Sequence, residues 1–204
     1  MLSNQETDQK LFNGLVGYLQ TYQHPDLGRF RDVINYAHFQ WQPVPIATLP
    51  ASDFLTASLE HTTRDNRELL QLFAQHQQYC RWEQSYKKSE GLVGDDMLAG
   101  YGFVEIAGKH GPFVSDQVRF GLGVWGPEIH YPPHRHQAEE LYIVLAGEAT
   151  FNIGHNAPCV FAAGESAYVQ PMAVHGFDTG KLPLVVLYIW QAGDLREQSS
   201  FNHQ

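Results

Sequence analysis

The sequence is poor in three features that would each point to a particular class of protein: cysteine, basic residues and long apolar runs. Its two cysteines, Cys80 and Cys159, form no CxxC pair, so we expect free thiols in a reducing compartment and no disulfide framework. Thirteen basic against twenty-two acidic residues give a net charge of −9, which argues against a nucleic-acid or anionic-membrane partner. No apolar run approaches the length that spans a bilayer, and the first residues lack the pattern of a secretory signal. We therefore expect a cytoplasmic protein that binds neither nucleic acid nor membrane.

Residues 1–90 carry the spacing of amphipathic helices. Leu11, Leu15 and Leu19 recur every fourth residue, which predicts a helix over 10–22. A second helix is expected over 30–39. After a proline-rich connection at 42–52, one long or two shorter helices are expected over 54–86, with Ser52 or Asp53 as the cap. We expect these helices to form an N-terminal segment that packs on a barrel and not an independent domain.

Residues 91–204 read as a second part, the β-barrel domain itself. Glycine becomes frequent, and short β-prone runs alternate with turn residues at 101–108, 117–126, 140–147, 148–154, 165–171 and 182–190. Several short strands at this spacing predict a sandwich or barrel, so the fold class is mainly β with α. Ala146-Gly147-Glu148, between two of these runs, predicts a tight hairpin.

The candidate site lies in residues 125–147, WGPEIHYPPHRHQAEELYIVLAG. Because side chains two apart in a strand share a face, His134 and His136 point the same way, and Glu140 shares a face with Tyr142. His175 is a further candidate downstream. Imidazoles with a carboxylate suit a first-row divalent metal, and this donor set accepts Zn, Fe, Mn, Co or Ni.

The structural alternative for each residue stays open at this point. A lone histidine in a strand is more often a hydrogen-bonded structural residue than a ligand, but a His-x-His pair followed by a glutamate favours a metal. Tyr142 can be core or catalyst, and Tyr131 can serve only to shape the turn before its two prolines. Three other histidines have no partners at metal spacing and receive no role: His110, His130 and His155.

These residues resemble the two motifs of the cupin superfamily. The first is matched by His134-x-His136, three residues, Glu140, six residues and Gly147, and the second by Gly164, Pro171 and His175. The chain departs from the pattern in a longer spacer before His134 and in a second motif without its inner glycine and final asparagine. The resemblance implies a double-stranded β-helix, or jelly-roll barrel, with one divalent metal ion. The ligands it implies are His134, His136, Glu140 and His175.

A narrower resemblance is to the cupin dimethylsulfoniopropionate lyases of the DddL/DddQ type. The segment YPPHRHQAEELYIVLAGEATF is similar to their signature, in which tyrosines stand at the positions of Tyr131 and Tyr142. This resemblance implies cleavage of dimethylsulfoniopropionate to acrylate and dimethyl sulfide. A tyrosine is the implied base, with Tyr142 the first candidate and Tyr131 the second.

The implied reaction is chemically reasonable for these residues. A metal ion on the substrate carboxylate acidifies the neighbouring C–H, and a nearby divalent cation favours the phenolate of Tyr142. Aromatic faces attract a sulfonium cation, and the candidates are Trp125, Phe151, Tyr101, Tyr188 and Trp190. Two other functions stay open: another metal-dependent cupin enzyme such as a dioxygenase or isomerase, and a non-enzymatic cupin that binds a small ligand. A homodimer also stays open, since cupin barrels often pair.

Overall fold

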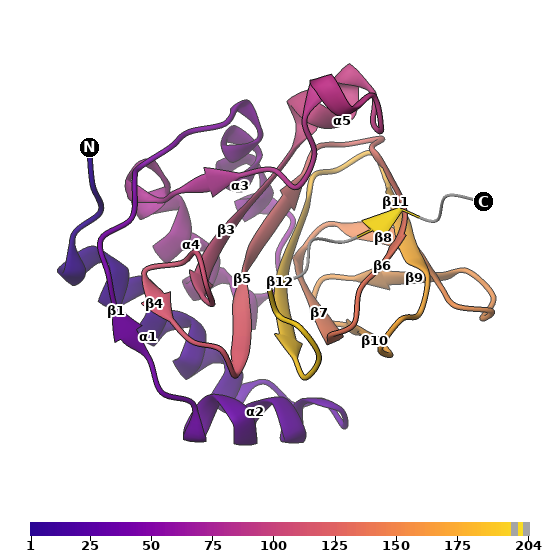
Figure 1. Cartoon of the computed structure of the whole chain (residues 1–204). Helices are drawn as coiled ribbons and strands as arrows, with labels where there is room; N and C mark the ends of the chain where they lie inside the picture. Colours follow the sequence, from indigo (N-terminus) through magenta and orange to yellow (C-terminus); the bar gives the residue numbers. More distant parts are fainter. Residues whose placement is uncertain (197–199, 202–204) are drawn as a thin grey trace.

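The protein is a helical layer packed on two β-sheets, seen in a computed structural model that describes residues 1–196 and 200–201 (Figure 1). The helices are α1 (Gln5–Thr21), α2 (Leu27–Tyr36), α3 (Asp53–Ala57), α4 (Arg64–His76) and α5 (Asp95–Gly100). The strands are β1 (Gln40–Trp41), β2 (Trp82–Glu83), β3 (Tyr101–Ala107), β4 (Phe113–Val114), β5 (Val118–Trp125), β6 (His130–Arg135), β7 (Glu139–Ala146), β8 (Glu148–Ile153), β9 (Cys159–Ala162), β10 (Ser166–Val169), β11 (His175–Thr179), β12 (Leu184–Gln191) and β13 (Ser200–Phe201). None of the helices in this part of the chain has the length and apolar character needed to cross a membrane.

The helices form where the leucine spacing predicted them. The side chain of Asn4 caps α1 by accepting a hydrogen bond from the Thr7 backbone, and Leu11, Leu15 and Leu19 are buried along one face of the helix. The region 54–86 contains two shorter helices, α3 and α4, and not one long one. Ser52 precedes α3, although its side chain makes no capping hydrogen bond there.

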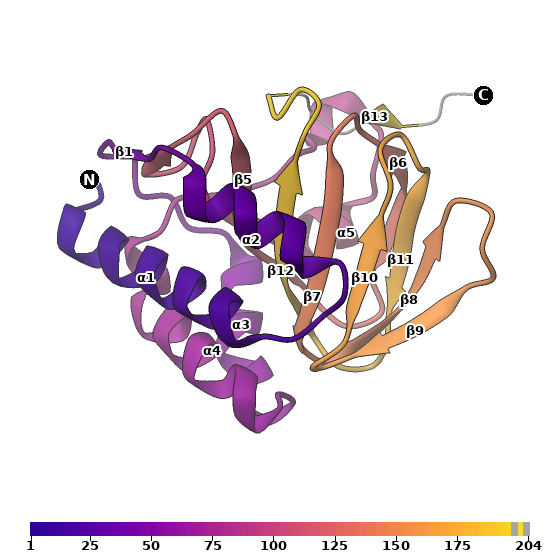
Figure 2. The ribbon, with the colours of Figure 1, turned by 90° about the horizontal axis from the view of Figure 1, so that it is seen from below.

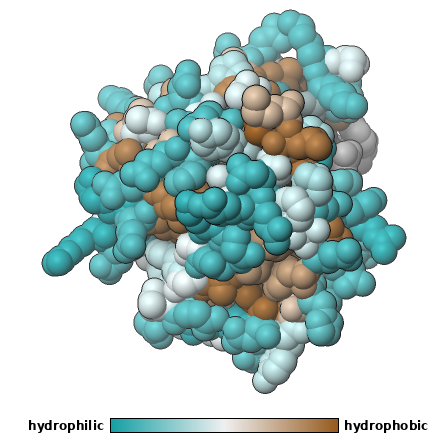
Figure 3. All heavy atoms as spheres, turned by 90° about the vertical axis from the view of Figure 1, so that its left-hand side faces the viewer, coloured by the Kyte–Doolittle hydropathy of each residue, from teal (hydrophilic) through white to brown (hydrophobic). Residues whose placement is uncertain are grey.

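The two sheets face each other and enclose the interior of the barrel. In the described chain, the larger sheet has the order β1-β4-β3-β5-β12-β7-β10, with β2 paired to β3, and the smaller has the order β13-β6-β11-β8-β9. Helices α1, α2 and α4 cover the outer face of the larger sheet (Figures 1 and 2). The helical side of the molecule is largely hydrophilic on its surface, with separate small apolar patches (Figure 3). The apolar faces of these helices are therefore buried against the sheet.

The larger sheet separates two hydrophobic cores. Along β12, Leu187 and Ile189 belong to the core beneath the helices, whereas Tyr188 and Trp190 belong to the core inside the barrel. This alternation follows from the two-residue repeat of a strand whose faces are both buried. The inner face of this sheet therefore decides what lines the barrel.

The hairpin predicted at Ala146-Gly147-Glu148 is wrong. Strand β7 pairs with β12 and β10 in the larger sheet, and β8 pairs with β11 and β9 in the smaller one, so the chain crosses between sheets at Gly147. Gly147 has φ = +73°, and a Cβ atom there would lie 2.1 Å from the carbonyl oxygen of Pro183. Glycine is thus required both by the left-handed backbone and by the close packing.

Candidate metal centre and its cavity

Three short segments bring the predicted ligands together. His134 lies near the end of β6, His136 just after it, and Glu140 near the start of β7. His175 begins β11 and is the cross-strand partner of His134 in the ladder between β11 and β6. His134 and His136 are buried while Arg135 between them is exposed, which confirms that the two histidines share a face.

The three histidines form a buried cluster with defined ring orientations. Each is 1% exposed, and their ligand atoms all lie within 4.8 Å of one another. Each Nδ1 lies 2.9 Å from a backbone carbonyl oxygen, and the respective carbonyls belong to Pro132, Ala138 and Ala173. Because a carbonyl oxygen only accepts, each Nδ1 donates its hydrogen, and each neutral ring presents the lone pair of Nε2 to the cluster. This is the arrangement that orients metal-binding histidines.

Glu140 completes a set of acceptors that require a cation. One of its carboxylate oxygens, Oε2, lies 3.0 Å from Nε2 of His136 and 3.3 Å from Nε2 of His175. Because the hydrogen of each ring is on Nδ1, the two Nε2 atoms face the carboxylate with lone pairs, which repel it. A proton or a metal ion between them removes this repulsion. Nε2 of His175 is also buried without a hydrogen-bond donor or acceptor partner in the described residues. The donor set therefore fits a divalent metal ion.

The protonation of the cluster follows from its burial and its charges. Burial, followed by the proximity of His175, lowers the pKa of His134 to about 3, so this ring is neutral at physiological pH. Burial alone would raise the pKa of Glu140, but the contacts with His136 and His175 together outweigh it and hold this pKa well below its usual range. The site thus offers a carboxylate and a neutral imidazole, which are the forms that bind metal.

The two predicted tyrosines both lie beside the cluster, next to different histidines. The ring of Tyr131 lies 4.8 Å from that of His134, and the ring of Tyr142 lies 6.2 Å from that of His175. Burial raises the pKa of both hydroxyls well above the usual value, and the negative charge of Glu140 adds to the effect at Tyr142. Without a cation in the cluster both side chains are therefore neutral phenols, and a phenolate at either position needs a compensating positive charge.

Trp190 fixes the orientation of one histidine. Its ring is stacked on that of His136 with centroids 3.9 Å apart and planes inclined by 29°. Trp190 is also the cross-strand partner of Glu140 in the ladder between β12 and β7. The sequence indicated Trp190 only as one of several aromatic candidates. In the structure it packs against a predicted metal ligand.

A cavity of about 230 Å³ opens beside the cluster, which is smaller than the roughly 300 to 1,000 Å³ of a pocket for a drug-sized ligand. Gly121 and Gly123 on the inner side of β5 contribute no side chain to the barrel interior at this level. Of the aromatic candidates, Phe151 is buried in the core and does not line the cavity. The aromatic residues of the wall are Tyr101, Phe103, Trp125, Tyr131, Tyr142, Tyr188 and Trp190.

The cavity also has charged walls that the sequence reasoning did not identify. They are formed by Arg81, Glu83, Glu105, Arg119 and Arg196, and His110 also lines this part of the cavity. The two-residue repeat of the strand could have indicated Arg119, because Arg119 lies on the same strand face as Gly121, Gly123 and Trp125. A charged residue on the inner face of a barrel strand is rarely there for packing alone.

Comparison with known proteins assigns this architecture to a family. The sequence model described as dimethylsulfoniopropionate lyase matches residues 28–186. The chain belongs to the dimethylsulfoniopropionate lyase family. This confirms the resemblance inferred from the tyrosine and histidine motif, and with it the expectation of an enzyme of this family.

Individual members of the dimethylsulfoniopropionate lyase family are similar to this chain in sequence or in fold. Dimethylsulfoniopropionate lyase DddQ of Ruegeria pomeroyi is 27% identical over 154 residues, which cover 76% of this chain and 75% of that protein. The crystal structure of that lyase from R. pomeroyi DSS-3 matches with a TM-score of 0.85 at 24% identity, over 98% of both chains. A structure described with the lyases RdDddP and RnDddQII matches with a TM-score of 0.85 at 25% identity, over 97% of this chain and 98% of that one. The expected β-barrel preceded by helices is thereby confirmed.

Proposed function

We propose that this chain cleaves dimethylsulfoniopropionate to acrylate and dimethyl sulfide by β-elimination. The observation that carries the proposal is the buried convergence of three imidazole lone pairs and one carboxylate beside a phenol, in a member of this lyase family. His134, His136, Glu140 and His175 are the proposed ligands of one divalent ion, whose identity among Zn, Fe, Mn, Co and Ni is open. Such an ion supplies a Lewis acid for the substrate carboxylate.

Tyr142 is the proposed base. Its phenolate takes the proton from the carbon next to the carboxylate, the C–H electron pair becomes the new double bond, and the C–S bond breaks. The sulfur keeps that bonding pair and leaves as neutral dimethyl sulfide, so no acid is needed to assist its departure. Because burial and Glu140 both raise the pKa of Tyr142, this role depends on positive charge in the adjacent cluster.

The aromatic walls account for the other end of the substrate. A sulfonium cation is attracted to aromatic faces, and Tyr101, Trp125 and Tyr131 lie within 5.4 Å of one another by ring centroids. Tyr131 thereby has two proposed roles, as a wall for the sulfonium and as the second candidate for the base.

The test measures dimethyl sulfide in the headspace over purified protein supplied with dimethylsulfoniopropionate and each of the five metals in turn. The Tyr142→Phe variant should lose elimination while it keeps a full equivalent of bound metal, whereas His175→Ala should lose both. Tyr36→Phe serves as the matched control, because Tyr36 is 79% exposed on the helical layer. No dimethyl sulfide with any metal would contradict the proposal, and consumption of oxygen would favour a dioxygenase instead.

Three further expectations stay predictions. They are the division into a helical segment at 1–90 and a barrel domain at 91–204, the homodimer, and the cytoplasmic location. Size-exclusion chromatography with light scattering would test the homodimer.

A further inference from the structure

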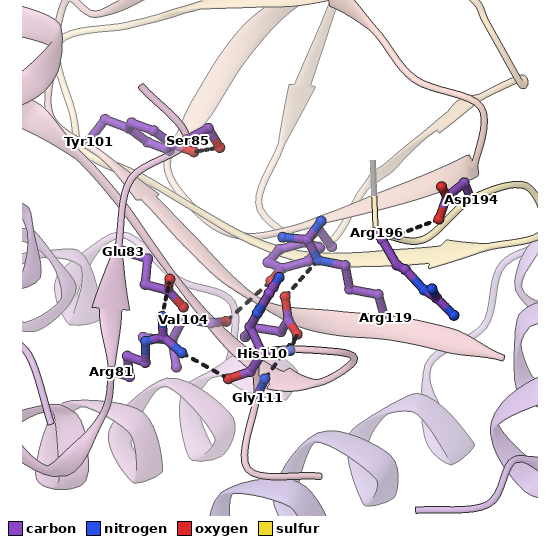
Figure 4. A network of polar contacts seen from close by, with 12 residues as sticks. Arg81, Glu83, Ser85, Tyr101, Val104, His110, Gly111, Arg119, Asp194 and Arg196 are labelled. Atoms are coloured by element: carbon purple, nitrogen blue, oxygen red, sulfur yellow. Dashed lines mark hydrogen bonds and ion pairs between the residues drawn. The ribbon is translucent and has the colours of Figure 1, made fainter. Parts of the chain in front are cut away.

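Arg119 is a buried cation on the inner wall of the active-site cavity. Its side chain is 15% exposed, and its Nε lies 2.8 Å from Oε2 of Glu105, which is 1% exposed. The centre of its guanidinium group, Cζ, lies 4.8 Å from the ring centroid of Trp190 and 5.9 Å from that of Phe103. Figure 4 shows Arg119 amid the polar residues of this wall, with Arg81 and Glu83 to one side and Arg196 to the other.

A structural role explains Glu105 and one nitrogen of Arg119. The second carboxylate oxygen of Glu105 accepts hydrogen bonds from the backbone N–H groups of His110 and Gly111, at 2.6 and 2.9 Å. Glu105 thus anchors the loop after β3 and compensates the charge of Arg119. The contact of Oε2 with Nε of Arg119 is an ion pair and not an aligned hydrogen bond, and the described residues show no hydrogen bond between Glu105 and the terminal nitrogens of the guanidinium group.

The terminal nitrogens of Arg119 are left without acceptors. A guanidinium group carries five N–H donors, of which four are on the two terminal nitrogens. No hydrogen bond joins these nitrogens to another described residue. They are also not fully buried, and Arg119 lines the cavity. Donors in a largely buried position are expected to have an acceptor, so the free donors point to a ligand of the cavity.

The position of Arg119 relative to the metal cluster follows from strand register. Trp190 on β12 is paired with Arg119 on β5 on one side and with Glu140 on β7 on the other. Arg119 and Glu140 therefore lie on the same inner face, one strand to either side of Trp190, and both line the same cavity. A small ligand in this cavity can meet the guanidinium group and the metal cluster together.

We propose that Arg119, positioned by Glu105, binds the carboxylate of the substrate. A planar guanidinium group with free terminal N–H donors matches the two oxygens of a carboxylate. A carboxylate has two oxygens, so this contact is compatible with a metal ion on the other one. This contact places the carboxylate end of the zwitterion beside Arg119, and the sulfonium end then lies against the aromatic walls. This inference rests on the proposed function and names the residue that selects a carboxylate substrate.

The deciding experiment measures binding of acrylate, the carboxylate product, by calorimetry to the metal-loaded protein, which needs no turnover. Arg119→Met should weaken acrylate binding by roughly tenfold to a hundredfold, since hydrogen bonds between charged groups are the strong ones. Acrylamide, which lacks the charge, should bind weakly and equally to both proteins. Arg67→Met, on the exposed face of α4, is the matched control and should bind acrylate as the wild type does.

The outcomes separate this inference from the proposed function. Undiminished acrylate binding by a folded, metal-loaded Arg119→Met variant would refute the role of Arg119, even if the wild type releases dimethyl sulfide. Acrylate binding that depends on Arg119, in a wild type that releases none, would instead refute the proposed reaction and keep the carboxylate site. If Arg119→Met fails to fold, Arg119→Lys takes its place: it keeps the charge but not the paired donors, so weakened binding supports the inference and wild-type binding overturns it.

Discussion

Replacing Glu140 by glutamine tests the metal site with the smallest change of shape. The change removes one negative charge at a position where Oε2 lies 3.0 and 3.3 Å from two imidazole nitrogens. Removing one partner from a buried charge pair costs about 3 kcal/mol or more, which corresponds to a weakening of metal binding by at least about a hundredfold. With metal in excess, that loss lowers the metal-dependent part of the free energy of unfolding by about 2.7 kcal/mol. For a chain of this length we expect the metal-induced rise in Tm to shrink by roughly 5 to 11 °C.

The assay is thermal unfolding of wild type and variant, each with and without excess metal. The compared quantity is the rise in Tm that excess metal produces in each protein, so a difference in stability between the two metal-free proteins does not enter the result. Glu68→Gln, at an exposed position of α4, makes the same chemical change away from the site and should leave the metal-induced shift intact. An undiminished shift in Glu140→Gln would exclude Glu140 as a ligand.

Three more outcomes follow from contacts around the site and in the core. Trp190→Leu removes the ring stacked on His136 and should weaken metal binding by roughly tenfold to a hundredfold in a chelator competition, and unchanged affinity would contradict the positioning role. Asn66→Ala removes a buried amide that donates to two carbonyls of β7 and accepts from a helix tyrosine, so urea unfolding should show a loss of about 2 kcal/mol. Burial raises the pKa of the Cys80 thiol to about 12 while Cys159 is exposed, so a thiol reagent at pH 8 should label one cysteine per native chain and two only after unfolding.

The fold could be read from the sequence where the pattern is local. The leucine spacing of α1 and the β-prone runs at 140–147 and 182–190 are each contained in a short stretch of chain, and the structure has a helix and two strands there. Strand β6 was not predicted as a full strand, because Pro132 and Pro133 interrupt the usual signal and cannot donate to the ladder. The hairpin at Gly147 failed for a different reason. A glycine with positive φ serves a hairpin and a crossing between sheets equally well, and only the distant pairing of β8 with β11 decides between them.

The site shows the same division between local and distant information. The shared face of His134 and His136 follows from their spacing alone, whereas the approach of His175 requires the ladder between β6 and β11. Arg119 was overlooked because its meaning depends on which side of β5 faces the barrel, and on the carboxylate that Glu105 brings from β3. Local spacing thus predicts which neighbouring residues share a face. Which residues line the cavity depends on the order of the strands in the sheets.

The helical layer contributes to the site through β7, the strand that carries Glu140 and Tyr142. At one end of this strand, Asn66 of α4 donates hydrogen bonds to the carbonyl oxygens of Val144 and Leu145, at 3.2 and 3.1 Å. At the other end, Glu139 points outward, where its carboxylate accepts hydrogen bonds from Tyr168 and Gln191 and lies 3.4 Å from a nitrogen of Arg29 on α2.

Because consecutive residues of a strand point to opposite faces, each outward contact of Glu139 also limits how Glu140 can rotate into the barrel. A ligand on a strand held at both ends keeps its carboxylate in place in the absence of metal, and such preorganisation favours tight and selective binding. The helices carry none of the proposed ligands, and their chemical importance lies in holding this strand from outside.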